Sequence, residues 1–321
     1  MSAGDTSRVA TTSRPLGVAA RAHRASSVAM DTLVSVEVLS AAPVERVAAA
    51  VQRALGWFAV VERACSRFDP ASEVRGLFGQ VGRPVAVSPL LFEAAQFALA
   101  LARRTHGAFD PAIGHVLEAK GFDRHYLTGE RVHSAVGAGE RPSFRDVLLD
   151  PERRTLTLRR PLVLDLGAVA KGLAIDLAAR ELGAFDRFCV EAGGDLFARG
   201  TNAEGRPWRV GVQHPRDPDA AAYLLDVSDQ AICTSGDYER RAADADEHHL
   251  VDPRSGRSPR ALASVTVIAP TALAADGLGT AAFVLGPERG RRLLEQEGVG
   301  GVFITPTGGV RTTRGLRGAR A

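Results

Sequence analysis

Apolar residues in this chain repeat with two different periods, and this mixture constrains the fold more than any other feature of the sequence. Between residues 33 and 39 they alternate with polar residues, which predicts a half-buried strand. After Pro43 they recur at helical spacing as far as Val61, which predicts an amphipathic helix. Both patterns return along the chain, so we expect an α+β fold of mixed sheets and packed helices.

The remaining segments follow the same two patterns. Further helices are predicted from the Ser88-Pro89 start signal to Gly107, from the 165–172 turn to Gly183, from Pro270 to Leu285, and from Pro287 to about Gln296. Strand-like runs cover 146–149, 155–158, 162–165, 187–190, 208–213, 223–227, 264–269 and 302–305. No Pro/Ser-rich linker divides the middle of the chain. We therefore expect a single domain, with a division into two lobes left open.

Positive charge is concentrated at the two ends of the chain. Residues 1–28 carry four arginines and one aspartate, residues 309–321 carry four arginines, and the whole chain has a formal net charge of +3. Neither end shows hydrophobic periodicity, so both are predicted to be flexible basic tails around a domain of residues 29–308. The tails lack interleaved aromatic residues, and we expect no nucleic-acid partner.

Composition also bears on location. No run of about 18 uncharged apolar residues occurs, so we expect no membrane span. Residues 1–28 contain neither the apolar core of a secretory signal nor an early cysteine, which predicts a cytoplasmic protein. The three cysteines, Cys65, Cys189 and Cys233, have no metal-binding spacing and are interpreted as small buried residues.

The segment from Asp165 to Gly172 combines a strand-like end, a glycine turn and a predicted helix start. A helix start offers free backbone N–H groups and a positive dipole end, which suit an anion. Lys171, one of only two lysines in the chain, adds a full charge there. The alternative is a simple structural corner with a solvated lysine, and this segment alone does not decide between the two.

Asp276 and Thr280 lie four residues apart in a predicted helix and would face the same side. Both offer hard oxygen ligands of the kind that Mg²⁺ takes together with water and phosphate oxygens. The alternative is a hydrogen bond on the helix face. A carboxylate on an otherwise apolar helix needs compensation, which favours the metal.

Two further polar turns could carry chemistry. His249 precedes an apolar pair and a tight Asp-Pro turn, so it could move a proton near neutral pH or could cap the turn. Phe109 and Asp110 follow a predicted helix end, where they could stack on a ligand and accept hydrogen bonds, or could serve only the turn and the core.

Together these segments resemble the ApbE-type FAD:protein FMN transferase family. The matching pieces occur in the family's order over roughly residues 29–305 and are Met30–Thr32, Ser66–Glu73, Gly107–Pro111, Asp165–Gly172, Ala192–Asp195, Thr234–Tyr238, His249–Gly256 and Ala274–Thr280. The chain departs from the usual pattern at Asp31, Phe78, Glu191 and Gly279.

The resemblance implies a site and a reaction. The residues that match FAD-lining positions are Met30, Ala108, Phe109, Asp110, Asp165, Lys171 and Leu250. The carbonyl of Ala168, with Asp276 and Thr280, matches the Mg²⁺ ligands, and His249 and Asp276 match catalytic positions. The implied reaction transfers FMN from FAD to a Thr or Ser hydroxyl of an acceptor flavoprotein, forms a phosphoester and releases AMP.

Two other functions stay open at this point. Water could replace the acceptor hydroxyl, which would make the protein an FAD pyrophosphatase that releases FMN and AMP. The protein could also bind and buffer flavin without turnover. A metal-binding Asp276 and Thr280 pair disfavours the second alternative, since flavin binding alone needs no metal.

Overall fold

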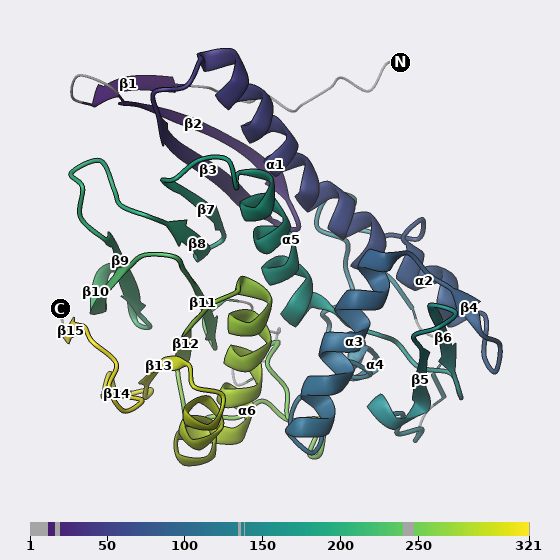
Figure 1. Ribbon diagram of the computed structural model, residues 1–321. Coiled ribbons are helices and arrows are strands. Elements are labelled where there is room, and N and C mark those ends of the chain that lie inside the picture. The colour runs from purple at the N-terminus through teal and green to yellow at the C-terminus, as the bar shows by residue number, and fades with distance from the viewer. Residues whose placement is uncertain (1–11, 17–19, 134–135, 138, 240–246, 321) are drawn as a thin grey trace.

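The structure is a computed structural model that describes residues 12–16, 20–133, 136–137, 139–239 and 247–320. Its centre is a nine-stranded sheet in the order β1-β2-β3-β7-β8-β11-β12-β13-β14, in which every neighbouring pair is antiparallel (Figure 1). These strands are β1 (Thr12–Leu16), β2 (Ala20–Ala29), β3 (Thr32–Ser40), β7 (Phe188–Ala192), β8 (Asp195–Arg199), β11 (Gln230–Gly236), β12 (Ser264–Ala269), β13 (Gly300–Ile304) and β14 (Val310–Thr312).

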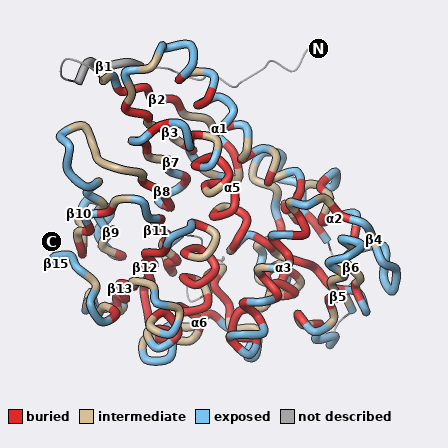
Figure 2. The backbone as a smooth tube through the Cα atoms, viewed as in Figure 1, coloured by how far each residue is buried: buried red, intermediate tan, exposed pale blue. Residues whose placement is uncertain are grey.

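Three long helices cover one face of this sheet. They are α1 (Val44–Cys65), α5 (Gly167–Glu181) and α6 (Ala272–Gln296); α1 packs on β2 and β3, α5 on β7, and α6 on β11 and β12. The apolar sides of these helices and the inner face of the sheet form the main core, which Figure 2 shows as a continuous buried zone. Removing apolar surface from water in this way is the main driving force that holds such layers together.

A smaller part of the protein extends from the end of α1 that lies away from the hairpin β2–β3 (Figure 1). It contains α2 (Glu73–Phe78), α3 (Pro89–Arg104), α4 (Gly114–Ala119), the 3₁₀ turn Phe144–Asp146 and a sheet of β4 (Val85–Ala86), β6 (Thr155–Leu158) and β5 (Val147–Asp150). The Ser88 hydroxyl accepts a hydrogen bond from Leu91 N and so caps α3, as the Ser-Pro signal predicts.

The other face of the large sheet is covered only in part. A second sheet, of β9 (Trp208–His214), β10 (Asp217–Val227) and β15 (Ala319–Arg320), packs there and forms a second, smaller core. Ile232 of β11 and Ile268 of β12 belong to this second core, while Cys233 and Val267 beside them belong to the main core. This alternation is what a sheet buried on both faces requires.

The predicted α+β class is confirmed, and most of the predicted elements are present. Two details differ. Residues 162–165 form no strand, and only a single bridge joins Val163 to Ile113. The two helices predicted after Pro270 and Pro287 adjoin as α6, with Gly286 at φ 78° between them, because proline cannot continue the hydrogen bonding of the first helix.

The prediction of flexible tails over residues 1–28 and 309–321 is wrong where the structure describes these residues. Ala20–Ala29 is strand β2, paired with β3 along its whole length, and β1 pairs with β2 in turn. At the other end, β14 pairs with β13, and β15 pairs with β10. The inner face of β2 consists of small residues such as Ala25 and Ala29, which give too weak a hydrophobic alternation to reveal a strand.

Within the part of the chain that the structure describes, none of the helices combines the length and the apolar character that crossing a bilayer requires. The cytoplasmic location and the absence of a nucleic-acid partner stay predictions.

The buried face of β2 provides a first test of this fold. Ala25 is 3% exposed against the main core, whereas the neighbouring Arg24 points to the other face and pairs with Glu37. We expect Ala25→Arg to lower the free energy of unfolding by about 3 kcal/mol or more, because it places a charge in the core. Arg24→Ala should cost less than about 1 kcal/mol, since it removes only a surface ion pair. Urea unfolding of both variants measures the difference, and equal small effects would mean that β2 contributes little to the fold.

Candidate active site

The site is built where α5 and α6 cross at close range. Gly172 lies at the crossing, and a Cβ atom there would stand 2.3 Å from the carbonyl oxygen of Ala272, so only glycine fits. Gly172 N donates a hydrogen bond of 3.1 Å to Asp276 Oδ2. In the opposite direction, Asp176 of α5 accepts hydrogen bonds of 2.7 and 2.9 Å from Ala272 N and Leu273 N at the start of α6. Each helix therefore supplies a carboxylate to the backbone of the other.

An ion pair lies beside this crossing. Lys171 Nζ is 2.7 Å from Asp195 Oδ2, and the other oxygen of Asp195 accepts a hydrogen bond of 2.8 Å from Thr234 N. Burial lowers the pKa of Lys171, but the attraction of Asp195 and Asp276 outweighs it, so the pKa of Lys171 is raised. Burial, and then the nearby Asp195 carboxylate, raise the pKa of Asp276. Lys171 is thus a fixed cation between two carboxylates rather than a solvated side chain.

The oxygen ligands predicted for a metal lie together. Thr280 follows Asp276 by one turn of α6, its Oγ1 is 3.3 Å from Ser235 Oγ, and Ala168 stands in the first turn of α5. Among the described residues, no three His, Cys, Asp or Glu side chains gather as a metal centre. A metal here would therefore rest on one buried carboxylate and neutral oxygens. That donor set suits Mg²⁺, which keeps several waters and bonds to phosphate.

A cavity of about 450 Å³ opens above these groups. It is lined by every site residue that the sequence predicts: Met30, Ala108, Phe109, Asp110, Asp165, Ala168, Lys171, His249, Leu250, Asp276 and Thr280. These residues come from segments separated by up to 250 positions in the sequence. The structure brings them to one place, and the roles assigned to them stay predictions.

Met30 and Asp31 reach this cavity on a tight turn between β2 and β3. Both have positive φ, 53° and 63°, and the flanking residues Ala29 and Thr32 form the last pair of the hairpin. Positive φ at both central positions is typical of a type I′ turn, in which Asn, Asp and Gly are preferred. Asp31 suits its position, whereas Met30 holds a backbone conformation that is uncommon for its type.

Asp110 and Phe109 are more deeply engaged in the fold than the sequence indicates. The two oxygens of Asp110 accept hydrogen bonds from Ala112 N and Phe144 N, at 2.8 and 3.1 Å, and burial raises the pKa of this carboxyl. Phe109 is 5% exposed and belongs to the main core. Both residues line the cavity and also hold its wall.

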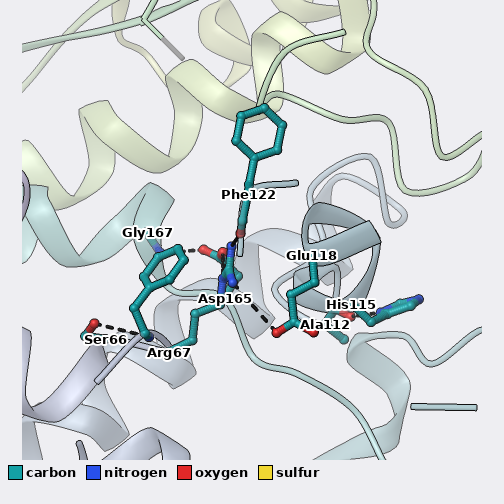
Figure 3. Close-up of polar contacts among 9 residues, drawn as sticks. Ser66, Arg67, Ala112, His115, Glu118, Phe122, Asp165 and Gly167 are labelled. Carbon is teal, nitrogen blue, oxygen red and sulfur yellow. Dashed lines mark hydrogen bonds and ion pairs between the residues drawn. The ribbon is translucent and has the colours of Figure 1, made fainter. Parts of the chain in front are cut away.

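Arg67 joins three parts of the cavity wall and was not among the predicted site residues (Figure 3). Its side chain is 3% exposed; Nε donates to Asp165 Oδ2 at 2.5 Å, and Nη2 donates to the carbonyl oxygen of Phe122 at 2.6 Å. Its Nη1 stands 3.8 Å from Glu118 Oε1. Asp165 also accepts a hydrogen bond from Gly167 N, so Arg67 fixes the carboxylate that holds the start of α5.

The segment that carries His249 is held by its neighbours. Glu247 Oε2 accepts from Lys120 Nζ at 2.7 Å and from Ser258 N at 3.1 Å. His248 is buried, with Nε2 3.0 Å from the carbonyl oxygen of Pro259. His249 lines the cavity instead, with its ring edge-on to Phe122 at 6.4 Å between centroids.

Sequence reasoning missed two residues of this site, Arg67 and Asp195. Asp195 directly follows the Gly193-Gly194 turn between β7 and β8, whereas Asp165 precedes the turn at Gly167. An acidic residue beside a glycine turn is therefore a pattern that could have indicated Asp195. Arg67 is one arginine among many in this chain, and only its burial reveals it.

Comparison with known proteins places these features in one family. The ApbE family model matches residues 30–303 of the chain. The FAD:protein FMN transferase of Klebsiella pneumoniae is 34% identical over 259 residues, which cover 77% of this chain and 71% of that protein.

Two solved structures have the same architecture. The crystal structure of the ApbE protein from Thermotoga maritima superposes with a TM-score of 0.81 at 28% identity, covering 91% of this chain and 97% of that one. The flavin transferase ApbE from Vibrio cholerae superposes with a TM-score of 0.76 at 26% identity, covering 91% and 96%.

Arg67 allows a test of the cavity wall. We expect Arg67→Met to lower the free energy of unfolding by about 3–5 kcal/mol, because it removes the buried guanidinium that donates to the half-buried Asp165 carboxylate and to the Phe122 carbonyl. Arg67→Lys should recover little, since one ammonium cannot reach both partners as the guanidinium fork does. Arg53→Met, which removes an exposed pair with Glu181, is the control and should cost less than about 1 kcal/mol. Urea unfolding decides, and full recovery by lysine would show that charge alone matters.

The Glu247 carboxylate predicts a dependence of stability on pH. The hydrogen bond from Lys120 is the main cause that lowers its pKa from 4.5 to about 2 in the folded protein. The stability it contributes is therefore present above about pH 4.5 and is lost as the pH falls toward 2. We expect Glu247→Gln to cost no more than about 1 kcal/mol at pH 7, and the cost to shrink over that window.

Unfolding of the wild-type protein and of Glu247→Gln at several pH values between 2 and 7 measures how the cost of the substitution depends on pH. In a Lys120→Met background the pH-dependent part should shrink, because the main cause of the lowered pKa is gone, and the donors of Ser258 should account for what is left. A cost that stays constant across the whole range would contradict the assignment.

Proposed function

The chain belongs to the ApbE family, and from this premise we propose that it transfers the FMN part of FAD to a Thr or Ser hydroxyl of an acceptor protein. The observation that carries the proposal is the convergence of all the predicted site residues on one cavity above the Lys171, Asp195 and Asp276 cluster. A cavity with one fixed cation, a helix start and a carboxylate on its floor suits a substrate with a pyrophosphate group.

The chain's own residues supply binding and orientation. The first turn of α5 and the Lys171 ammonium present positive charge to the phosphates, and the Arg67 and Asp165 pair keeps that helix start in place. Met30, Ala108 and Leu250 give the cavity the apolar wall that a flavin ring requires. Most FAD contacts are therefore expected from residues other than Asp276 and Thr280.

Proton transfer is assigned to His249. The acceptor oxygen forms a bond to the FMN-side phosphorus, and the phosphorus–oxygen bond to AMP breaks, so AMP leaves with that electron pair. The imidazole of His249, held at the cavity by the Glu247 segment, receives the hydroxyl proton. Because imidazole changes its protonation near neutral pH, it can both accept a proton and release one.

The metal fits the residues present. Asp276, Thr280 and the carbonyl of Ala168 would hold Mg²⁺, which when bound neutralises the pyrophosphate charge and polarises the phosphoryl group. The floor of the cavity carries two carboxylates, Asp195 and Asp276, and one lysine, Lys171, so an additional positive charge would be stabilised there.

The direct test incubates the protein with FAD, Mg²⁺ and candidate acceptor flavoprotein domains. Transfer should give a fluorescent acceptor band that survives SDS, together with one AMP for each FMN transferred. A parallel sample without acceptor separates the alternatives: rapid release of FMN and AMP would point to a pyrophosphatase, and unchanged FAD in a tight complex with no transfer to any domain would point to a flavin carrier.

Two carboxylates at the same helix crossing give a pair of variants for comparison. Asp276→Asn removes a charge from the cavity floor, so we expect a loss of transfer rate of about 100-fold or more, with FAD affinity only modestly reduced. Asp176→Asn changes a half-buried carboxylate that holds the start of α6 but does not line the cavity. It should lower stability and leave the rate per folded molecule within about twofold.

Thr280→Ala removes a neutral ligand and should be rescued in part by high Mg²⁺ concentration. The measurements are FAD binding by flavin fluorescence and transfer rate against Mg²⁺ concentration. If Asp276→Asn transferred FMN at the wild-type rate in limiting Mg²⁺, Asp276 would be a structural helix residue and the assigned metal site would be wrong.

A further inference from the structure

A second cavity, of about 520 Å³, lies on the side of the large sheet away from α1. Its floor is formed by the outward-facing residues of β2, β3 and β7, and strand β9 forms its opposite wall. The lining residues used below are Ser35, Glu37, Glu191, Gly194 and Trp208. We call this cavity the outer groove.

Strand β9 presents its edge to the outer groove. Trp208, Arg209, Val210 and Gly211 are consecutive and all line it. Because successive side chains of a strand point to opposite faces, four consecutive residues can line one cavity only along the strand's edge. β9 is the last strand in the order β15-β10-β9, so among the described residues this edge has no ladder partner. An open edge of this kind accepts another extended chain through its backbone groups.

The outer groove adjoins the candidate active site. The two glycines of the β7–β8 turn divide the two cavities, with Gly193 lining the first and Gly194 the second. Gly194 has φ 88° and nothing within 4 Å of where a Cβ would lie, so the turn is a low barrier. A chain in the outer groove can thus continue over this turn toward the first cavity.

An exposed apolar pair lies at the same end. Val28 and Leu33 face each other across the β2–β3 hairpin and are 68% and 60% exposed. They directly flank the Met30–Asp31 turn and Thr32, all three of which line the active-site cavity. Paired apolar residues at this exposure are uncommon in the protein, and they stand beside the opening where a large substrate must enter.

We propose that the outer groove binds the extended segment of the acceptor protein that carries the target hydroxyl, as a strand added to the edge of β9. This inference rests on the proposed function, because only a transferase that acts on a protein needs to hold a polypeptide next to its cavity. An apolar side chain of the segment packs on Val28 and Leu33, and the hydroxyl-bearing residue passes over the Gly193-Gly194 turn.

The floor of the outer groove defines the chemistry of this segment. Glu37 is already paired with Arg24 at 2.8 Å, whereas Glu191 is an exposed carboxylate at the end nearer the turn. Ser35 of β3 stands directly opposite Glu191 of β7 and is small, so the floor carries little side-chain bulk beside Glu191. The groove therefore fits an extended segment with small side chains toward the floor and no acidic residue opposite Glu191.

The test uses an acceptor domain that the wild-type protein flavinylates, and two variants of the outer groove. Ser35→Trp fills the floor, and Leu33→Asp replaces the apolar contact by a charge. For each, we expect the KM for the acceptor to rise at least tenfold, with the FAD dissociation constant and the rate at saturating acceptor within twofold of wild type. A photocrosslinking benzoylphenylalanine at position 35 should become attached to the acceptor.

Matched controls lie in the small sheet of β4, β5 and β6. Thr157→Trp and Leu148→Asp make the same changes at half-buried and exposed strand positions there, and benzoylphenylalanine at position 157 serves for crosslinking. These should leave the acceptor KM unchanged and give no crosslink.

The outcomes separate the two proposals. If the wild-type protein transferred FMN but both groove variants kept an acceptor KM within twofold, the outer groove would be wrong and the proposed function would stand. If the wild-type protein transferred FMN to no acceptor, the proposed function would fail and the outer groove with it. Equal rises in KM for groove and control variants would also overturn the proposal, since they would reflect general damage.

Discussion

The close crossing of α5 and α6 at Gly172 is the constraint on which the candidate site depends. Two helices can approach this closely only if one presents no side chain at the crossing, and a Cβ at Gly172 would collide with the backbone of Ala272. Backbone N–H groups at the crossing are satisfied by carboxylates from the opposite helix, Asp276 on one side and Asp176 on the other. The crossing therefore fixes the rotation of both helices. Lys171 and Thr280 face the cavity as a consequence, because each lies within a turn of a residue that the crossing holds.

This arrangement also sets the electrostatics of the cavity floor. A buried carboxylate lowers the stability of the folded protein unless it is paired with a cation. Here Lys171 lies near two carboxylates, Asp195 and Asp276. Lys171 pairs directly with Asp195. Burial raises the pKa of Asp276, and the attraction of Lys171, followed by the hydrogen bond from Gly172 N, acts in the opposite direction.

The sequence predicts the elements of this fold better than their arrangement, for physical reasons. Strands and helices with branched apolar residues, such as residues 33–39 and α1, were predicted closely because their periodicity is strong. β2 was missed since its buried face consists of alanines and His23, and β11 because its second half, Thr234–Gly236, has no apolar residue. All the predicted site residues line one cavity, but that set came from the order of motifs along the chain. Arg67 lies in the matching Ser66–Glu73 segment, but its burial and its contacts with Asp165 and Phe122 appear only in the structure.

The order of strands in the large sheet has a consequence for biosynthesis. β2 and β3 are made first, yet the strand that pairs with β3 is β7, in which Val190 stands opposite Val36. A ribosome that adds about 5–20 residues per second needs about 8–30 s to make the intervening stretch of about 150 residues. For that time the edge of β3 stays open, and β1 is the strand of the sheet that can pair with the hairpin. The turn at Met30 then meets the turn at Gly193 only when β7 has docked, so the nascent chain completes the candidate site late in its own synthesis.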